Sequence, residues 1–237
     1  MKLLLIAAGD EIREALSRIA EPLGLALIHY RHILKAMDNL DELSPQAVLI
    51  STRDFPRHWK PLVQFAKTNV AGQTSSVGPT GCAVLLLRGE DFPPEEAQKA
   101  CFLGVSGIAA DSLDRPEDAS RLRALLVEAL GLKGGPAAPA RRLVPRDRSG
   151  LCLVHPESKA LVLARVKAVS ATGLSFETTA PNLIERISAG TILSECSLRL
   201  GERILSPICR RGRERSLDFV YLEAGEEQYL DGWLRAH

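Results

Sequence analysis

The chain has 237 residues, a formal net charge of +1, 46% hydrophobic residues and 25% charged residues. Two domains that each bury a core fit this length, and the charge balance excludes the wide basic face of a general nucleic-acid binder. The first apolar run, Leu3 to Ala8, is too short for a signal peptide or a membrane span, so we expect a cytoplasmic protein without membrane insertion. The five cysteines form no CxxC pair and no histidine pair has metal-ligand spacing, so no metal and no cofactor are expected.

The first part of the chain alternates short apolar runs with helical patterns. We expect strands at residues 3–8, 25–29, 47–51, 83–87 and 107–109. We expect helices from about residue 10, at 56–67 and 94–103, and from Pro116, a favourable first-turn proline, to a stop at Gly131. Continuous apolar strands separated by helices predict a doubly wound parallel sheet, an α/β fold of the flavodoxin or receiver type, over residues 1–131.

Two segments of this half have loop or linker composition. Residues 68–81, TNVAGQTSSVGPTG, are rich in glycine, serine and threonine, but no Gly-Lys-Ser/Thr follows, so we expect a surface loop and no phosphate site. Residues 131–140, GLKGGPAAPA, have the composition of a linker. The predicted organisation is a domain at 1–131, a linker with an arginine-rich arm at 132–149, and a second domain at 150–237.

The second domain is predicted to be antiparallel. Short β-rich runs stand at residues 161–169, 173–178, 191–200, 203–210 and 215–222, with turn residues between them. Their close spacing leaves no room for crossover helices, so they pair antiparallel in a small barrel or sandwich. The final segment, AGEEQYLDGWLR, places apolar side chains on one face and is expected to cap the barrel as a helix.

The first domain resembles response-regulator receiver domains in the stretches LLLIAAGDEIREAL, PQAVLISTRDFP and FLGVSGIAADSLD. Such domains hold Mg²⁺ with acidic residues at the strand ends and accept a phosphoryl group on an aspartate. Here the acidic pair is replaced by Ala7 and Ala8, the acceptor by Ser51, the hydroxyl residue by Arg88, and the lysine by Asp111. Alanine offers no oxygen ligand to Mg²⁺. The resemblance therefore implies a pseudo-receiver, a platform for docking, dimerisation or signal coupling.

Four arginines stand in RRLVPRDR, residues 141–148, and Arg142 and Arg146 form an RxxxR pattern to which Arg141 adds charge. About 22 residues later comes AVSATG, with Ser170 and Gly173 at a strand-to-turn position. The planar guanidinium group matches phosphate oxygens and the O6/N7 edge of guanine bidentately. Glycine suits a turn that needs positive φ, and the serine hydroxyl is available to a base or to the turn itself.

This pair of motifs, at this separation, resembles the PilZ family of bacterial cyclic di-GMP receptors, whose motifs are RxxxR and [DN]xSxxG. The resemblance spans about residues 141–235 and implies a PilZ-like β-barrel with a C-terminal helix. It also implies that Arg141, Arg142, Arg146, Ser170 and Gly173 bind cyclic di-GMP. Ala168 stands where the family has Asp or Asn, and the sequence leaves open whether this abolishes binding or only weakens it.

Two functions remain open. The first is a non-enzymatic receptor in which cyclic di-GMP binding rearranges the domains and affects an unidentified protein partner of the pseudo-receiver, with a homodimer possible. The second is a scaffold that binds protein partners and no nucleotide. An enzyme is not expected, because the five histidines lie near no suggestive serine or cysteine nucleophile.

Overall fold

The computed structural model describes residues 1–71, 82–132, 143–145 and 149–237. The chain divides into two compact units, Met1–Gly135 and Pro136–His237. The first unit contains a parallel α/β sheet, and the second contains an antiparallel half-barrel with a C-terminal helix, so the predicted fold class is confirmed. Most of the predicted linker lies outside the described residues, as do residues 72–81 of the predicted loop.

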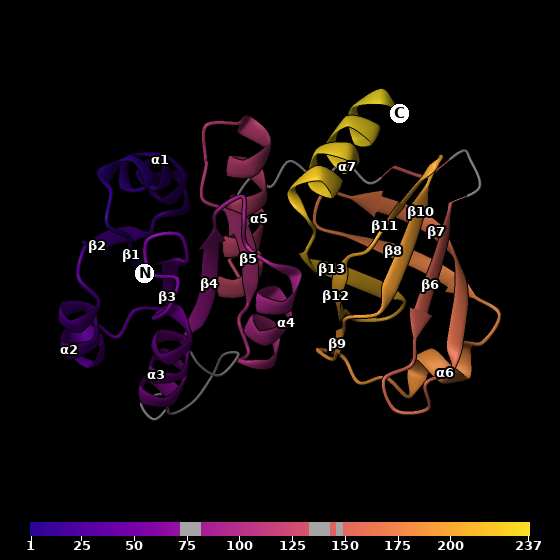
Figure 1. Ribbon diagram of the computed structural model, residues 1–237, viewed down its shortest axis with the longest axis horizontal. Coiled ribbons are helices and arrows are strands. Elements are labelled where there is room, and N and C mark those ends of the chain that lie inside the picture. The colour runs from indigo at the N-terminus through magenta and orange to yellow at the C-terminus, as the bar shows by residue number, and fades with distance from the viewer. Residues whose placement is uncertain (72–81, 133–142, 146–148) are drawn as a thin grey trace. The chain divides into compact units, whose positions relative to one another are not determined.

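The sheet of the first unit has five parallel strands in the order β2-β1-β3-β4-β5 (Figure 1). This is the strand order of flavodoxin-like and receiver folds. The strands are β1 (Lys2–Ile6), β2 (Ala26–Tyr30), β3 (Ala47–Ser51), β4 (Ala83–Arg88) and β5 (Gly107–Ala110). The helices are α1 (Asp10–Ala20), the short 3-10 helix η1 (Glu21–Leu23), α2 (Ile33–Leu43), α3 (Trp59–Ala71), α4 (Pro94–Phe102) and α5 (Pro116–Leu130).

Helices cover both faces of this sheet. On one face α1 and α5 pack over strand residues that include Leu5, Leu49 and Leu85. On the other face α2 and α3 pack over Ile6 and Val48. The inner strands β1, β3 and β4 are therefore apolar except at their ends, where Lys2, Ser51 and Arg88 stand, as a sheet covered on both faces requires. Strand β2 is only partly buried, because it lies at the edge of the sheet and has one neighbour.

The second unit is an eight-stranded half-barrel in the order β11-β10-β6-β7-β8-β13-β12-β9. Its strands are β6 (Gly150–Val154), β7 (Leu161–Ser170), β8 (Gly173–Thr178), β9 (Ile192–Leu193), β10 (Cys196–Leu200), β11 (Arg203–Leu205), β12 (Ile208–Arg211) and β13 (Ser216–Tyr221). The short helix α6 (Pro181–Glu185) follows β8, and α7 (Ala224–Ala236) follows β13. All paired strands of this sheet are antiparallel, as predicted.

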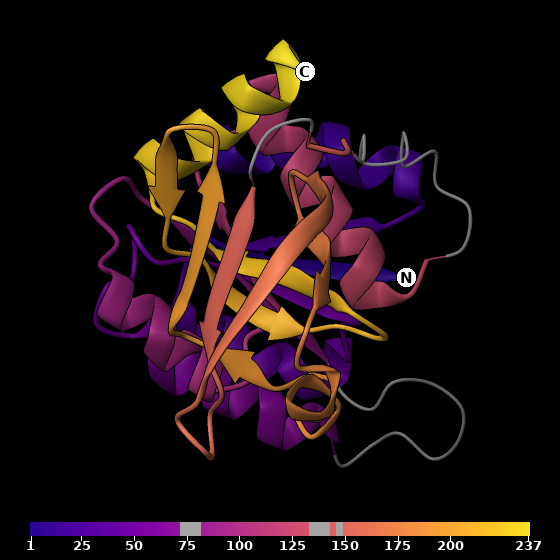
Figure 2. The ribbon, with the colours of Figure 1, turned by 90° about the vertical axis from the view of Figure 1, so that its right-hand side faces the viewer.

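Helix α7 packs on the half-barrel, as the sequence predicted. Its buried residues Leu230 and Trp233 belong to the core that the strands form. The Tyr229 hydroxyl donates a hydrogen bond to the carbonyl oxygen of Leu200 over 2.9 Å, which ties the helix to β10. Within this unit α7 (yellow) and α6 lie at opposite ends of the strands (Figure 2).

Several elements differ from their predictions. Helix α2 was not predicted, because its N-cap is His32, which is not a usual capping residue. Strand β6 was not predicted either, and α3 extends to Ala71, so the first residues of the predicted loop are helical. The predicted strands at 191–200 and 203–210 are each two strands. The first run divides because β9 pairs with β12 whereas β10 pairs with β6 and β11. In the second run Pro207, which has no N–H to donate, lies between β11 and β12.

Candidate functional site

The turn between β7 and β8 carries the two predicted site residues that the structure describes, Ser170 and Gly173. These residues form the last pair of the β7–β8 ladder. The Ser170 hydroxyl donates a hydrogen bond to the Gly173 carbonyl oxygen over 3.1 Å, and the serine is 6% exposed. Of the two roles that the sequence left open for this hydroxyl, the structure shows the one that stabilises the turn.

Gly173 is required for close packing, and the expectation that it needs a positive φ was wrong. Its φ lies outside the left-handed region, as befits the first residue of a strand. A Cβ atom at this position would lie 2.4 Å from the carbonyl oxygen of Leu217 and 3.1 Å from the Cα of Asp218. Strand β13 therefore approaches the turn so closely that only glycine fits without a shift of backbone.

The segment between the motif arginines pairs with β7. The Leu143 N–H donates to the Val169 carbonyl oxygen and the Val169 N–H donates to the Leu143 carbonyl oxygen, each over 2.9 Å. The Leu143 side chain packs against the core of the half-barrel, and Pro145 is buried. Val169 directly precedes Ser170, so this bridge places the middle of the RxxxR segment beside the second motif.

The three arginines predicted to bind the ligand, Arg141, Arg142 and Arg146, lie outside the described residues. Arg142 is covalently next to Leu143, and Arg146 follows the buried Pro145. The structure therefore describes the segment between the two motif arginines, and the binding roles of the arginines stay predictions.

Ala168 lies beside a β-bulge in β7. The register of β7 against β8 shifts just before Ala168, so that Lys167 is the extra residue. The Lys167 Nζ lies 2.9 Å from the Glu177 carboxylate, and this hydrogen bond holds the pKa of Glu177 below its usual range. The positive charges of Arg215 and Arg165 lower that pKa further. The residue next to Ala168 is thus engaged in an ion pair, whereas the alanine side chain offers no hydrogen bond.

Arg211, the last residue of β12, has a buried side chain. The residue is 7% exposed, and its Nη1 donates to the carbonyl oxygens of Gly212 and Ser216 over 2.6 Å and 3.3 Å. Burial lowers the pKa of the guanidinium group. Arg211 therefore holds the end of the β12–β13 hairpin, and it is not available as a surface cation.

In the first unit, the residues predicted at the receiver positions lie together at the carboxyl edge of the parallel sheet. Ala7 and Ala8 follow β1, Ser51 and Arg88 end β3 and β4, and Asp111 follows β5. Parallel strands present their carboxyl ends at one edge, which is where ligands bind in open α/β folds. The edge therefore has the position of a receiver site without the acidic pair of such sites.

Two residues that the sequence reasoning missed complete this edge. The Ala8 N–H donates to Asp54 Oδ2 over 2.8 Å, and the Asp54 N–H donates to Ser51 Oγ over 3.2 Å. The Arg53 Nε lies 3.0 Å from the Asp111 carboxylate. Burial raises the pKa of Asp111, Arg53 opposes this shift, and the charge of Asp54 adds to it. Both missed residues lie just after β3, in the stretch PQAVLISTRDFP. Aspartate is a typical turn residue, and this was the sequence signal that could have pointed to this turn.

Within the described ranges, no cluster of three or more His, Cys, Asp or Glu side chains has the geometry to hold a metal ion. The helices of that same part of the chain are all too short or too polar to cross a bilayer.

Two family models match the two units separately. Residues 1–105 match the family model TP_0454_N, described as an N-terminal domain, and residues 150–231 match TP_0454_C, described as a C-terminal domain. An uncharacterised protein of Treponema pallidum (strain Nichols) is 27% identical over 209 residues, which cover 88% of this chain and 86% of that protein.

Solved structures that are similar to the chain include receiver domains. A signal receiver domain of a two-component histidine kinase from Clostridium thermocellum has 17% identity and a TM-score of 0.44, and the match covers 54% of this chain and 96% of that one. The pseudo-receiver domain of the CikA protein has 20% identity and a TM-score of 0.37, with 54% and 95% covered. The strand order β2-β1-β3-β4-β5 of the N-terminal unit is the order found in receiver domains. The resemblance of the half-barrel to PilZ domains stays a prediction.

Proposed function

We propose that this chain is a non-enzymatic cytoplasmic receptor for cyclic di-GMP, and that the α/β unit is the part that contacts a protein partner. The nucleotide binds between the arm that contains Arg142 and Arg146 and the turn at Ser170 and Gly173. The observation that carries this proposal is the two-way hydrogen bonding of Leu143 with β7 next to Ser170. A residue between the two motif arginines is thereby next to the second motif, which follows about 22 residues later in the sequence.

The chemistry of the arm suits this ligand. Cyclic di-GMP carries two phosphate groups and two guanine bases, and arginine pairs bidentately with phosphate oxygens and with the O6/N7 edge of guanine. The cations Arg165, Lys167 and Arg215 add positive charge near the β7–β8 hairpin, in part offset by Glu177. In a chain of net charge +1, this local concentration of cations favours a small dianion as the ligand.

Ala168 sets the expected strength of binding. A carboxylate or amide at this position would accept a hydrogen bond from a guanine, and alanine leaves that donor unpaired. Such a loss costs about 1–3 kcal/mol, which corresponds to roughly a tenfold to hundredfold lower affinity. We therefore expect weaker binding than in a domain with the complete motif, and Ala168→Asp is expected to strengthen it.

Binding at the arm also provides the means of signalling. The arm belongs to the segment that joins the two units, so a ligand held by both the arm and the half-barrel constrains that segment. A ligand shifts a conformational equilibrium by its difference in affinity for the two states. The nucleotide is thus expected to change which arrangement of the units is populated, and with it the access of a partner to the α/β unit.

The test is titration calorimetry of the full chain with cyclic di-GMP. We expect saturable binding that Arg142→Ala and Arg146→Ala each weaken at least tenfold. Arg186→Ala is the control, because this exposed arginine follows α6 and lies at the other end of β8 from the turn. The absence of any heat of binding at near-millimolar nucleotide would overturn the proposal.

A scaffold without a nucleotide is the second candidate, and three observations favour it. Ala168 lacks the expected hydrogen-bonding group, the Ser170 hydroxyl is engaged by its own turn, and alanines occupy the receiver positions. This candidate predicts that the wild-type chain binds no cyclic di-GMP and that Arg146→Ala leaves partner capture unchanged. The receptor hypothesis predicts instead that the wild-type chain binds cyclic di-GMP.

A further inference from the structure

One long edge of the α/β sheet is open for pairing. Strand β2 ends the sheet, and no other described strand pairs with its outer side. The Ala26 N–H donates to the Met1 carbonyl oxygen, and the Tyr30 carbonyl oxygen accepts from the Ala7 N–H, so alternate residues of β2 face β1. The backbone groups of the intervening residues, Leu27 and His29, therefore point away from the sheet.

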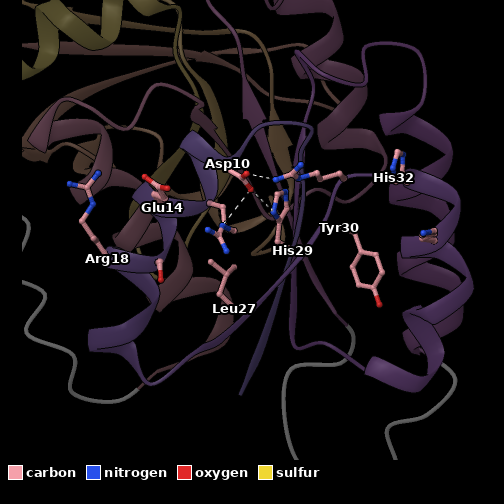
Figure 3. A pocket seen from close by; sticks show the side chains of 11 residues that line it. Asp10, Glu14, Arg18, Leu27, His29, Tyr30 and His32 are labelled. Carbon is pink, nitrogen blue, oxygen red and sulfur yellow. Dashed lines mark hydrogen bonds and ion pairs between the residues drawn. The ribbon is translucent and has the colours of Figure 1, made fainter.

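A cavity of about 1030 Å³ lies over this edge (Figure 3). Leu27 and His29, the residues whose backbone groups face outward, both line it. The His29 ring is fixed in place, since its Nε2 lies 2.8 Å from the Ala7 carbonyl oxygen and its Nδ1 lies 3.7 Å from the Asp10 carboxylate. The remaining lining comes from α1, from the residues after β2, and from Lys35 at the start of α2.

The cavity is positively charged. Four cationic side chains line it against two carboxylates, those of Asp10 and Glu14. Arg31 and Arg13 both pair with Asp10, and the hydrogen bond from Arg31 holds the pKa of that carboxyl below its usual range. The other two cations are Arg18 and Lys35.

Arg18 and Lys35 lie toward opposite ends of the β2 edge. Arg18 is near the end of α1, which precedes β2, whereas Lys35 lies in the first turn of α2, which follows β2. Because α1 and α2 cover opposite faces of the sheet, these two cations flank the edge from opposite faces. The edge from Leu27 to His32 spans about 16 Å at the usual rise per strand residue, and two carboxylates five residues apart in an extended peptide have this separation and lie on opposite faces.

A second hollow, largely apolar, adjoins this cavity beyond the end of β2. It has a volume of about 630 Å³, and its lining includes Ile33, Leu34, Phe55 and Pro56. Leu34 is 74% exposed, although it is a large apolar residue. A peptide that follows the edge past Arg31 thus meets an apolar surface that fits a bulky apolar side chain.

We propose that the β2 edge binds an extended, acidic segment of a partner protein as a sixth strand, with carboxylates at positions i and i+5 and an apolar residue directly after them. Main-chain hydrogen bonds to Leu27 and His29 supply the pairing, and Arg18 and Lys35 supply the charge recognition. This proposal rests on the part of the proposed function that assigns a protein partner to the α/β unit. It does not depend on the binding of cyclic di-GMP by the half-barrel.

The test measures fluorescence anisotropy of a labelled nonapeptide, GEVTVTELG with blocked ends, titrated with the full chain at low salt. We expect saturable binding that Leu27→Pro weakens at least tenfold, because proline removes an outward N–H without removing a bond to β1. Leu27→Thr is the matched control, since it loses the same apolar side chain and keeps the N–H. It is expected to bind within about threefold of wild type.

Charge recognition is tested with single reversals. Arg18→Glu and Lys35→Glu are each expected to weaken binding about tenfold, which corresponds to about 1.4 kcal/mol. The control is Arg186→Glu, the same change of charge on an exposed residue of the half-barrel unit, which is expected to leave binding unchanged. The peptide with both glutamates replaced by glutamine is expected to lose at least tenfold in affinity.

Three results would overturn the proposal: no binding of the acidic peptide, equal binding by Leu27→Pro and Leu27→Thr, or equal binding of the glutamine peptide. A dimer in sedimentation that Leu27→Pro dissociates would also overturn it, because the edge would then be occupied by a second copy. If the peptide does not bind but cyclic di-GMP does, the edge proposal is wrong and the nucleotide receptor is still supported. The two proposals can therefore be tested separately.

Discussion

Gly173 shows at the scale of one residue how the β7–β8 turn is built. The Leu217 carbonyl oxygen occupies the space that a Cβ atom would need, and the Ser170 hydroxyl donates to the glycine's own carbonyl oxygen. The motif SxxG therefore has a structural role in the hairpin, whether or not a ligand binds there. Gly150, at the start of β6, has open space where its Cβ would be.

We predict that Gly173→Ala lowers the free energy of unfolding by about 1–3 kcal/mol, because backbone must move to accommodate the new methyl group. Gly150→Ala is expected to change the free energy of unfolding by less than about 1 kcal/mol. Any such change is expected to be an increase, which stabilises the chain. Urea denaturation followed by circular dichroism measures both. Equal effects of the two substitutions would show that β13 moves aside at little cost.

At the scale of elements, the Glu226 side chain connects helix α7 to the half-barrel in addition to Tyr229. The Glu226 carboxylate accepts a hydrogen bond from the Ser206 N–H over 2.7 Å and one from the Glu223 N–H over 3.4 Å. The first of these bonds reaches the turn between β11 and β12, and the second closes the first turn of α7. The helix is thus positioned by its N-terminal turn as well as by Leu230 and Trp233 in the core.

We predict that Glu226→Ala lowers the free energy of unfolding by about 1–2 kcal/mol, because two backbone N–H groups lose a charged acceptor. Glu226→Gln keeps an acceptor oxygen and is expected to lose less than half as much. Thermal and urea unfolding of the three chains provides the comparison. If the glutamine variant loses as much as the alanine variant, the favourable charge at the helix N-terminus is the larger effect.

Elements with strong local signals were predicted, and those defined by pairing were not. The buried strands at residues 47–51 and 107–110 and the helix from Pro116 were visible as apolar runs and a start signal. The separation of β9 from β10 was not visible, because the run 191–200 has continuous β character. The run divides into two strands because its two parts have different partners. Strand β9 pairs with β12, at the opposite end of the strand order from β10.

The whole molecule consists of two units with separate cores. The core of the α/β unit and that of the half-barrel share no residues among those described. Leu49 lies at 0% exposure in the first core and Leu198 at 0% in the second. Each unit therefore has its own source of hydrophobic stabilisation.

We predict that Leu49→Ala destabilises the α/β unit by about 2–5 kcal/mol and leaves the half-barrel as stable as before. Hydrogen exchange with mass spectrometry on the intact chain is expected to show faster exchange in β1, β3 and β4 only. Leu198→Ala is expected to give the reverse pattern, with faster exchange confined to the half-barrel. Faster exchange in both units for either variant would show that they unfold as one.

The sequence by itself determined the fold class, the antiparallel character of the second half and the replacement of the receiver residues, because periodicity, spacing and residue identity are local properties. Only the tertiary structure decided why Gly173 must be glycine, where Asp54 and Arg53 lie, and that Leu143 pairs with Val169. The open edge of β2 also became visible only there. Each of these depends on which backbone lies beside which, and that is set by contacts between residues far apart in the chain.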